Sequence, residues 1–325
     1  MGKLNKGERY TEAFWDSIRT EGGISLKAHL RDHVTNEEVR SIASNVSVGG
    51  GRLAPVSIEE NILKRMKESN PIRQMATQLS LSAGNAVVPY IADNEAATFI
   101  KDNDPIPEGE FQLDAILLKG YRIARIVKLP EELEQDTEVN LQALVESYFA
   151  ESFSMAEENA FINGLGDEAG MPTGILTRAE VGVTGKHADN ITSEELTKLF
   201  YSLKPKYRQR AVWIMNDQTL LAVRSLKTTD GMPIYQPSLG NDAERLLGRP
   251  VLVSEYMPNL SNGNKAIAFG DLSYYVIGDR EGMVMQRLGE KYAVEGLVGV
   301  RGIKRVDANL AKPEAVKVFE NRTGV

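Results

Sequence analysis

The chain has 325 residues, of which 42% are hydrophobic and 26% are charged, a composition typical of a globular protein with about two or three compact units. It contains no cysteine, which excludes disulfide bonds, thiolate metal sites and thiol nucleophiles. The formal net charge of −7 argues against tight non-specific binding to nucleic acid. The first residues lack the apolar region of a signal peptide, and no apolar run of about 18 residues predicts a helix across a membrane.

The N-terminal region is predicted to form short helices. Residues 8–20 and 24–43 each carry apolar residues at helical spacing, and glycines separate them. One face of the first helix gathers its large apolar side chains, Phe14, Trp15 and Ile18. Consecutive glycines at 49–51 then predict a hinge, so we place a domain boundary there.

Residues 57–136 predict mostly extended structure after one helix. That helix is broken by Pro71 and followed by a strand, and NAVVPYI at 85–91 predicts another strand. YRIARI at 121–126 alternates between the two faces of a strand. The neighbouring segments offer little apolar surface to cover such a ribbon, so its packing partner is an open question.

The clearest helix spans 139–163, where apolar and small residues recur every three or four positions before Gly164 supplies the stop. Another helix is predicted to follow Ser193, with Glu195 nearby, and AVWIMN indicates a buried strand whose last residue, Asn216, caps the next helix. Further strands are predicted at 249–258, 265–279, 284–307 and 315–320. Helices and strands do not alternate regularly, so the fold class is α+β rather than doubly wound.

No motif makes a convincing active site or metal site. His29 and His33 have the four-residue spacing of a zinc pair, but the central acid is misplaced and no third ligand is evident. The basic run at 204–210 is typical of a solvated helix end or loop. The acids at 131–136 are typical of a solvated loop, with paired catalytic carboxylates as the alternative. We predict no catalytic residue, no metal and no cofactor.

Five blocks of sequence carry a family resemblance. The first block, residues 94–136, has an acidic residue and Ile-Pro before a Phe. Two predicted strands follow, and the block ends with the sequence PEELEQD. The others are ENAFINGLGDEAGMPTGIL, WIMNDQTLLAVRSLKTTDGMPIYQPS, LLGRPVLVSEYMP and AIAFGDLSYYVIGDREG. Each block alone is weak, but their order and spacing over about residues 49–320 are specific. Together they resemble the major capsid proteins of tailed bacteriophages, which have the Hong Kong 97 fold.

The resemblance implies how the chain is divided. The parts would be a helical scaffolding-like segment (1–48), an N-terminal arm (49–70), a peripheral domain (71–84, 126–189 and 273–308) with a spine helix (139–163), an extended loop (85–125) and an axial domain (190–272 and 309–325). The extended loop would be a two-stranded ribbon that reaches over a neighbouring subunit. That neighbour would supply the cover that the ribbon lacks in its own chain.

The implied function is structural. Hexamers and pentamers would build an icosahedral virion capsid around double-stranded DNA, assembled in the host cytoplasm without a membrane. The partners would be other copies and a portal protein, with a maturation protease or a decoration protein as further candidates. The residues expected at intersubunit contacts are Asp104, Glu108, Glu110, Lys119, Arg122 and Arg125. The residues expected to pack on the inner surface or on one another are Phe14, Trp15 and Ile18.

Other interpretations remain open. An encapsulin-type nanocompartment shell protein would have the same fold, but encapsulins typically lack a leading helical segment such as 8–43. A carboxylate-based enzyme would use the acids at 131–136. In the best-known capsid protein of this family, a loop lysine forms an isopeptide bond with an asparagine of another subunit. Here Lys119 or Lys101 would be the lysine, but residues 279–306 contain no asparagine, so we expect no such bond.

Overall fold

The computed structural model describes residues 52–53, 56–81, 85–91, 99, 113–130, 141–226 and 244–323. Its secondary structure is mixed α+β, as predicted. The chain divides into two compact units, which we describe separately. Within the described residues, unit 1 consists of those up to Gln74, Tyr121–Glu158 and Arg280–Val306, and unit 2 of Met75–Gly120, Asn159–Asp279 and those from Asp307 onward.

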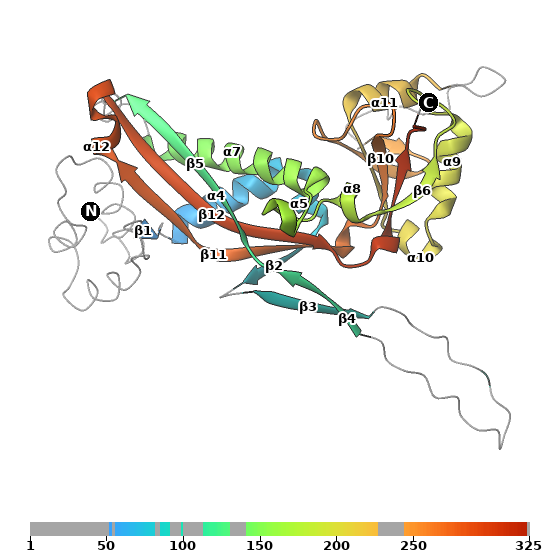
Figure 1. Ribbon diagram of the computed structural model, residues 1–325, viewed down its shortest axis with the longest axis horizontal. Helices are drawn as coiled ribbons and strands as arrows, with labels where there is room; N and C mark the ends of the chain where they lie inside the picture. The colour runs from blue at the N-terminus through green and yellow to red at the C-terminus, as the bar shows by residue number, and fades with distance from the viewer. Residues whose placement is uncertain are drawn as a thin grey trace, which may run out of the picture. The chain divides into compact units, whose positions relative to one another are not determined.

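Unit 1 is built on a sheet of long strands, visible in Figure 1. The strand order is β1-β11-β12-β5, and β12 pairs with β5 antiparallel over ten consecutive residue pairs. The elements of unit 1 are β1 (Arg52–Leu53), α4 (Val56–Ser69), most of α5 (Pro71–Met75), β5 (Tyr121–Pro130), most of α7 (Leu141–Asn163), most of β11 (Tyr275–Leu288), α12 (Gly289–Tyr292), η3 (Ala293–Glu295) and most of β12 (Leu297–Leu310). The sequence thus correctly predicted a helix interrupted at Pro71.

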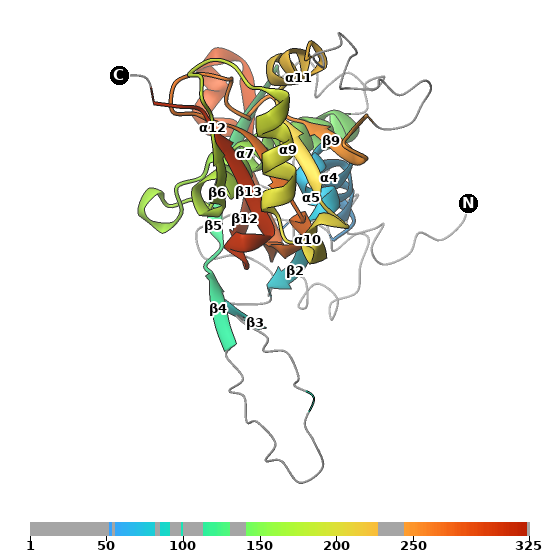
Figure 2. The same ribbon diagram turned by 90° about the vertical axis from the view of Figure 1, so that its right-hand side faces the viewer.

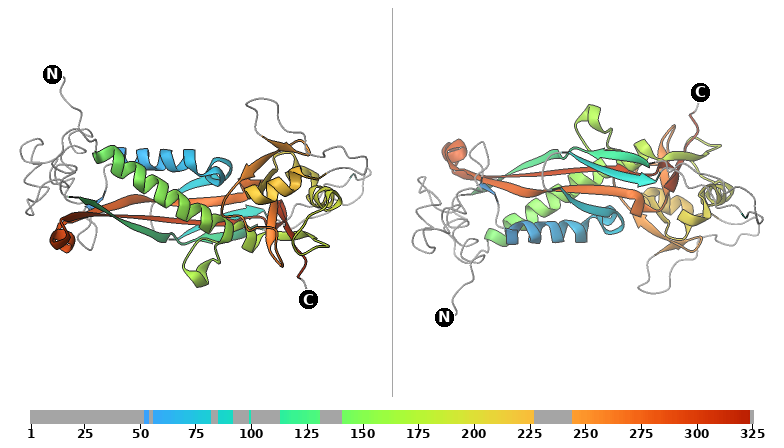
Figure 3. Two further views of the ribbon diagram at one scale, coloured as in Figure 1. Left: turned by 90° about the horizontal axis from the view of Figure 1, so that it is seen from above. Right: turned by 90° about the horizontal axis from the view of Figure 1, so that it is seen from below.

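The core of unit 1 lies between α4, α7 and one face of the sheet. The two helices run side by side in both views of Figure 3. The buried residues that pack together are Ile58, Ile62, Met66, Val127, Leu129, Val145, Phe149, Ala150, Phe153, Met283, Met285 and Val300. Phe149 approaches β12 so closely that a Cβ at Gly302 would lie 2.6 Å from its ring. The glycine therefore makes room for the helix on the sheet.

The long helix α7 confirms the prediction over 139–163 within the described residues, and Gly164 follows its end. The apolar residues of α7 in unit 1 fall on two faces. The row in the core is Val145, Phe149 and Phe153. Three other large apolar side chains are exposed by about half: Leu144 (47%), Tyr148 (40%) and Met155 (52%). Spacing alone predicted the helix but did not separate these two rows.

A buried carboxylate lies between two cations in unit 1. Glu157 on α7 has no exposed side-chain surface, and it accepts hydrogen bonds from Arg73 Nε (2.6 Å) and Lys304 Nζ (2.8 Å). Both cations are only 2% exposed. Breaking such a buried pair costs about 3–5 kcal/mol because the remaining charge stays desolvated. The cluster therefore links α5, α7 and β12.

Unit 2 contains a six-stranded sheet of order β6-β13-β10-β7-β9-β8. Figure 2 shows α9 against β13. The elements of unit 2, besides the ends of α7, β11 and β12, are β2 (Thr77–Leu81), β3 (Ala86–Ile91), β4 (Leu113–Leu118), η1 (Asp167–Ala169), α8 (Ile175–Arg178), β6 (Glu180–Thr184), α9 (Ser193–Ser202), α10 (Pro205–Arg208), β7 (Val212–Met215), α11 (Asp217–Arg224), β8 (Arg245–Leu246), β9 (Arg249–Val253), β10 (Lys265–Gly270), η2 (Leu272–Tyr274), η4 (Pro313–Ala315) and β13 (Val316–Glu320).

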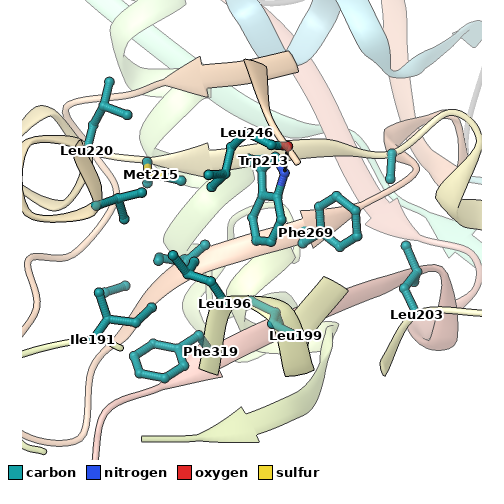
Figure 4. Close-up of a cluster of buried hydrophobic side chains, with 14 of the residues drawn as sticks. Ile191, Leu196, Leu199, Leu203, Trp213, Met215, Leu220, Leu246, Phe269 and Phe319 are labelled. Atoms are coloured by element: carbon teal, nitrogen blue, oxygen red, sulfur yellow. Dashed lines mark hydrogen bonds between the residues drawn. The ribbon is translucent and has the colours of Figure 1, made fainter. Parts of the chain in front are cut away.

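The core of the six-stranded sheet is aromatic at its centre (Figure 4). Trp213 and Phe269 stack with ring centroids 4.1 Å apart, and the Trp213 indole N–H donates to the Leu246 carbonyl (2.9 Å). Because the ring nitrogen has a partner, the whole side chain is buried at no polar cost. The strand β7 is fully buried, as the AVWIMN pattern predicted.

Side-chain caps begin the two longer helices of unit 2. The Asn216 side chain accepts from the Thr219 N–H (2.7 Å), which confirms the predicted cap of α11. The cap of α9 is Thr192, not the Ser193 that the sequence suggested. Thr192 and Glu195 form a reciprocal capping box, which satisfies two backbone N–H groups at once.

The basic run at 204–210 is not simply solvated, because it surrounds the carboxylate of Glu314. Lys204 Nζ contacts this carboxylate, Lys206 Nζ lies 3.3 Å from it, and the buried Tyr207 hydroxyl donates to it (2.5 Å). Burial opposes ionisation of Glu314, but these three donors outweigh it and lower its pKa to about 2. Burial and the same carboxylate raise the pKa of Tyr207.

We predict that Glu314→Gln destabilises the protein at pH 7 but not at pH 2. The folded pKa of Glu314, about 2, lies below its ordinary value of 4.5, so its stabilisation is complete above about pH 4.5 and is lost as the pH falls toward 2. We expect a loss of about 2 kcal/mol at pH 7, less than the shift alone implies because the carboxylate is partly exposed.

Urea unfolding of both proteins between pH 2 and pH 7 measures this difference. The control is Glu194→Gln, which removes an exposed carboxylate paired with Lys186 and Lys198 and should have a smaller effect. A Glu314→Gln difference that is the same at every pH would contradict the assignment of this pKa.

Candidate assembly surface

The strands β3 and β4 form a two-stranded antiparallel ribbon (Figure 2). Ala86 pairs with Leu118 at one end and Ile91 with Leu113 at the other. Residues directly opposite each other share a face, and successive residues alternate between the faces. The ribbon therefore has an inner face (Ala86, Val88, Tyr90, Asp114, Ile116 and Leu118) and an outer face (Val87, Pro89, Ile91, Leu113, Ala115 and Leu117).

The inner face is covered by the ribbon's own chain. Ile116 and Leu118 are 3% and 0% exposed, and they pack in a cluster with Leu81, Val276 and Ala311. This corrects the sequence-based expectation that the chain offers the ribbon little cover. The cover comes from strands distant in sequence, which local patterns do not reveal.

A glycine allows the close packing at this inner face. A Cβ at Gly278 on β11 would lie 2.8 Å from Leu81 Cδ1 and 3.0 Å from Leu118 Cδ1. Real Cβ atoms rarely come so near to neighbouring carbons, so a larger residue here would force the Leu81 and Leu118 side chains to shift. Gly278 thus leaves room for the two leucines to pack against β11.

The outer face is apolar, and the part of the chain that the structure describes leaves it exposed. Val87 and Leu113 are 64% and 60% exposed, and Leu117 is 44% exposed. Pro89 and Ala115, the pair between them, are also exposed. Exposed apolar patches of this kind mark surfaces that contact another molecule.

Near the end of the ribbon where Ile91 pairs with Leu113, two polar side chains form a hydrogen bond. The Tyr90 hydroxyl donates to Asp114 Oδ2 (2.7 Å), and this bond, with the Ala115 N–H, lowers the pKa of the carboxyl. Burial and the same carboxylate raise the pKa of Tyr90. Because the pKa of Tyr90 is raised and the pKa of Asp114 is lowered, the tyrosine is protonated and the aspartate is ionised at neutral pH.

At the other end of the ribbon, the turn after β4 is tied to unit 2 by carboxylates. The Lys119 N–H donates to Asp307 Oδ2 (2.6 Å), and the Lys119 ammonium contacts Asp167. Burial raises the pKa of Asp307, against the lowering effect of the backbone N–H donors. Lys119, one of the expected intersubunit residues, thus has an acidic partner in its own chain.

Arg122 and Arg125, also expected at intersubunit contacts, lie on β5 and are exposed. β5 pairs with β12 from Tyr121 onward, so the last five residues of the range 85–125 belong to the sheet and not to the ribbon. The Arg125 guanidinium donates to the Tyr148 hydroxyl (3.4 Å). The two arginines are therefore held on a sheet edge and are not part of the ribbon.

The remaining expected residues lie outside the described residues. These are Asp104, Glu108 and Glu110 of the extended loop, and Phe14, Trp15 and Ile18 of the N-terminal segment 1–48. Their contacts stay predictions. The sequence analysis in turn missed the outer-face residues Val87, Leu113 and Leu117, although the alternation in each strand was a usable signal.

Other kinds of site find no support in the described ranges. There, no three His, Cys, Asp or Glu side chains gather as a metal site would require. No helix in the same ranges is long and apolar enough to cross a membrane. The ribbon's outer face is thus the strongest candidate functional surface in this part of the chain.

Comparisons with known proteins agree with the sequence resemblance. The major capsid protein of Escherichia phage T5 is 26% identical over 181 residues, which are 51% of this chain and 39% of that protein, so the chain spans well under half of this curated relative. The capsid structure of a native GTA particle is 28% identical over 78% of this chain and 90% of that chain, with a TM-score of 0.67. A structure from Microbacterium phage Oxtober96, 16% identical, covers 92% of this chain and 100% of that chain with a TM-score of 0.59, and shows the shared fold alone.

The family model described as the phage capsid family matches residues 50–321. This range contains both the ribbon and the six-stranded sheet, and it is well over half of the chain. The chain therefore belongs to the phage capsid family and shares the fold of tailed-bacteriophage major capsid proteins.

Proposed function

We propose that this chain assembles, as hexamers and pentamers, into the icosahedral head of a bacteriophage that encloses double-stranded DNA. The observation that carries the proposal is the ribbon's outer face, which is apolar and exposed while the inner face is fixed in the ribbon's own chain. In a capsid, each subunit is surrounded by other copies of the same chain, so a neighbouring copy is the partner that would cover this face.

The outer face is large enough to matter for assembly. Fully burying a Val or Leu side chain contributes about 1.5–3 kcal/mol. Val87, Leu113 and Leu117 are each exposed by between 44% and 64%, so their burial on a neighbour would contribute a few kcal/mol in total. In a closed shell, the outer face of each subunit packs on one neighbour, and each subunit is also packed on by another neighbour's outer face. The free energies of these contacts add up over the shell.

The fold supports roles for the other parts of the chain. We assign residues 190–272 and 309–325, which hold every strand of the six-stranded sheet except β6 (Glu180–Thr184), to the axial domain around the five-fold and six-fold axes. Residues 71–84, 126–189 and 273–308 become the peripheral domain, with α7 as its spine helix. The segment 1–48 is an assembly aid, and 49–70 is the N-terminal arm.

The proposed partners follow from the same role. Other copies of the chain, a portal protein, and a maturation protease or a decoration protein would meet the shell in the host cytoplasm. One of the structures that share the fold, a procapsid of satellite phage P4, includes a size-determination protein. An encapsulin-type shell would use the same ribbon contact, and packaged DNA rather than protein cargo would distinguish the two. No observation favours the enzyme alternative.

The assembly prediction concerns the outer face. In a variant with Val87→Lys and Leu117→Glu, the two changed residues lie opposite each other on β3 and β4, so their charges attract and the ribbon stays paired. The apolar surface is lost, so we expect folded subunits that form no closed shells. Electron microscopy and sedimentation measure assembly, and circular dichroism checks folding.

The control is Leu165→Glu, which places the same charge at a leucine that is 68% exposed and lies outside both the ribbon and the axial domain. It should leave the shells normal. If the double variant misfolds, Val87→Ser with Leu117→Ser removes the apolar surface without adding charge and repeats the test. Closed shells of normal size from a folded ribbon variant would refute the contact.

A further prediction concerns covalent cross-linking. Lys119 contacts Asp167, and residues 279–306 contain no asparagine to accept a lysine amine. An ionised carboxylate is a poor acyl donor to an amine, so we expect a shell without isopeptide bonds. Boiled particles on a denaturing gel should show single subunits of 35.9 kDa, or less after proteolytic cleavage. A ladder of covalent pentamers and hexamers would contradict this.

A further inference from the structure

The outward face of α7 in unit 1 carries an apolar row that stays largely exposed among the described residues, with only the Tyr148 hydroxyl bonded to Arg125. We call Leu144, Tyr148, Glu151 and Met155 the α7 stripe; the three apolar members are 47%, 40% and 52% exposed. At 100° per residue these four positions fall within about 60° of arc, so they form one continuous face. Glu151, also exposed, lies near its middle.

This face is unusual for the solvent side of a helix. A helix that packs one face in a core normally presents charged residues on the other. The 23 residues of α7 include no lysine and no arginine, and Val145, Phe149 and Phe153 already fill its inner face. A helix that is apolar on both faces is typically covered on both.

The N-terminal segment of the chain is attached close to this helix. Residues 1–51 precede β1, where Arg52 pairs with Met285 of β11. Met285 packs in the same core cluster as the inner face of α7. Between Thr20 and Arg52, the 11 residues outside the predicted helix 24–43 can alone span about 35 Å when extended. The α7 stripe from Leu144 to Met155 is about 17 Å long.

We propose that residues 8–20 of the same chain bind along the α7 stripe. As a helix, this segment would be about 20 Å long and would present Phe14, Trp15 and Ile18. The apolar members of the stripe stay largely exposed among the described residues, and attachment in one chain gives an effective concentration in the millimolar range. Each apolar face then covers the other.

Charge favours this segment over a second copy of α7. Two copies packed antiparallel through the stripe would bring their Glu151 side chains together near the centre, where like charges repel. The proposed helix 8–20 contains Arg9 and Arg19, with Lys3 and Lys6 just before it, against the acids Glu8, Glu12 and Asp16. Its two arginines offer cations that α7 itself lacks.

A disulfide between engineered cysteines tests this contact on unassembled subunits. The chain has no cysteine of its own, so Ser17→Cys with Ser147→Cys introduces a single pair, beside the two apolar faces rather than in them. Mild oxidation should link the two within one chain, seen as a faster band on a non-reducing gel. The control pair, Ser17→Cys with Thr197→Cys on the exposed side of α9, should not link.

A second readout uses the stripe itself. Leu144→Ser with Met155→Ser should reduce the Ser17–Ser147 cross-link at least fivefold and speed proteolysis within residues 1–51, whereas Leu221→Ser on α11 should change neither. Equal cross-linking of the test and control pairs, or a link formed only between chains, would overturn the proposal. The cross-linking assay uses unassembled subunits, so it is independent of shell formation. A cross-link in a protein that forms no shells would count against the proposed function alone. Shells formed by a protein that gives no cross-link would count against this contact alone.

Discussion

The ribbon is held by packing on one face only, and this constraint shapes both its stability and its use. A two-stranded ribbon is marginal by itself in water, so it needs a second layer. Leu118 and Ile116 find that layer on Val276 and its neighbours, and Gly278 keeps the approach close. The face left over is therefore both rigid and apolar. Rigidity matters because an interface that is already ordered loses little entropy on assembly.

The buried cluster around Glu157 holds the elements of unit 1 in place, as the packing of the inner face holds the ribbon. Arg73, Glu157 and Lys304 come from α5, α7 and β12, and their geometry leaves each helix little freedom to slide on the sheet. Replacing such a cluster with apolar residues is often neutral for stability, so its value here is the fixed register of these three elements. That register in turn determines which side of α7 faces outward.

Local signals in the sequence predicted much of the fold, and the misses concern contacts between distant segments. The helix over 139–163 and the cap at Asn216 depend on neighbouring residues, so both were predicted correctly. The cover of the ribbon depends on Val276 and Ala311, which no short pattern connects to β4. Lys304 lies on the apolar face of its strand, and a lysine in such a place indicates a buried carboxylate partner. The spacing of residues in the sequence could not identify Glu157 as that partner.

The central claim is that the outer face of the ribbon packs on a neighbouring subunit in the assembled shell. A cryo-electron microscopy reconstruction of particles assembled from the full chain tests it most directly, at a resolution that shows side chains. The account predicts that Val87, Leu113 and Leu117 are buried against another subunit while Ile116 and Leu118 keep the packing within their own chain. A closed shell in which the three outer residues remain in solvent would contradict it.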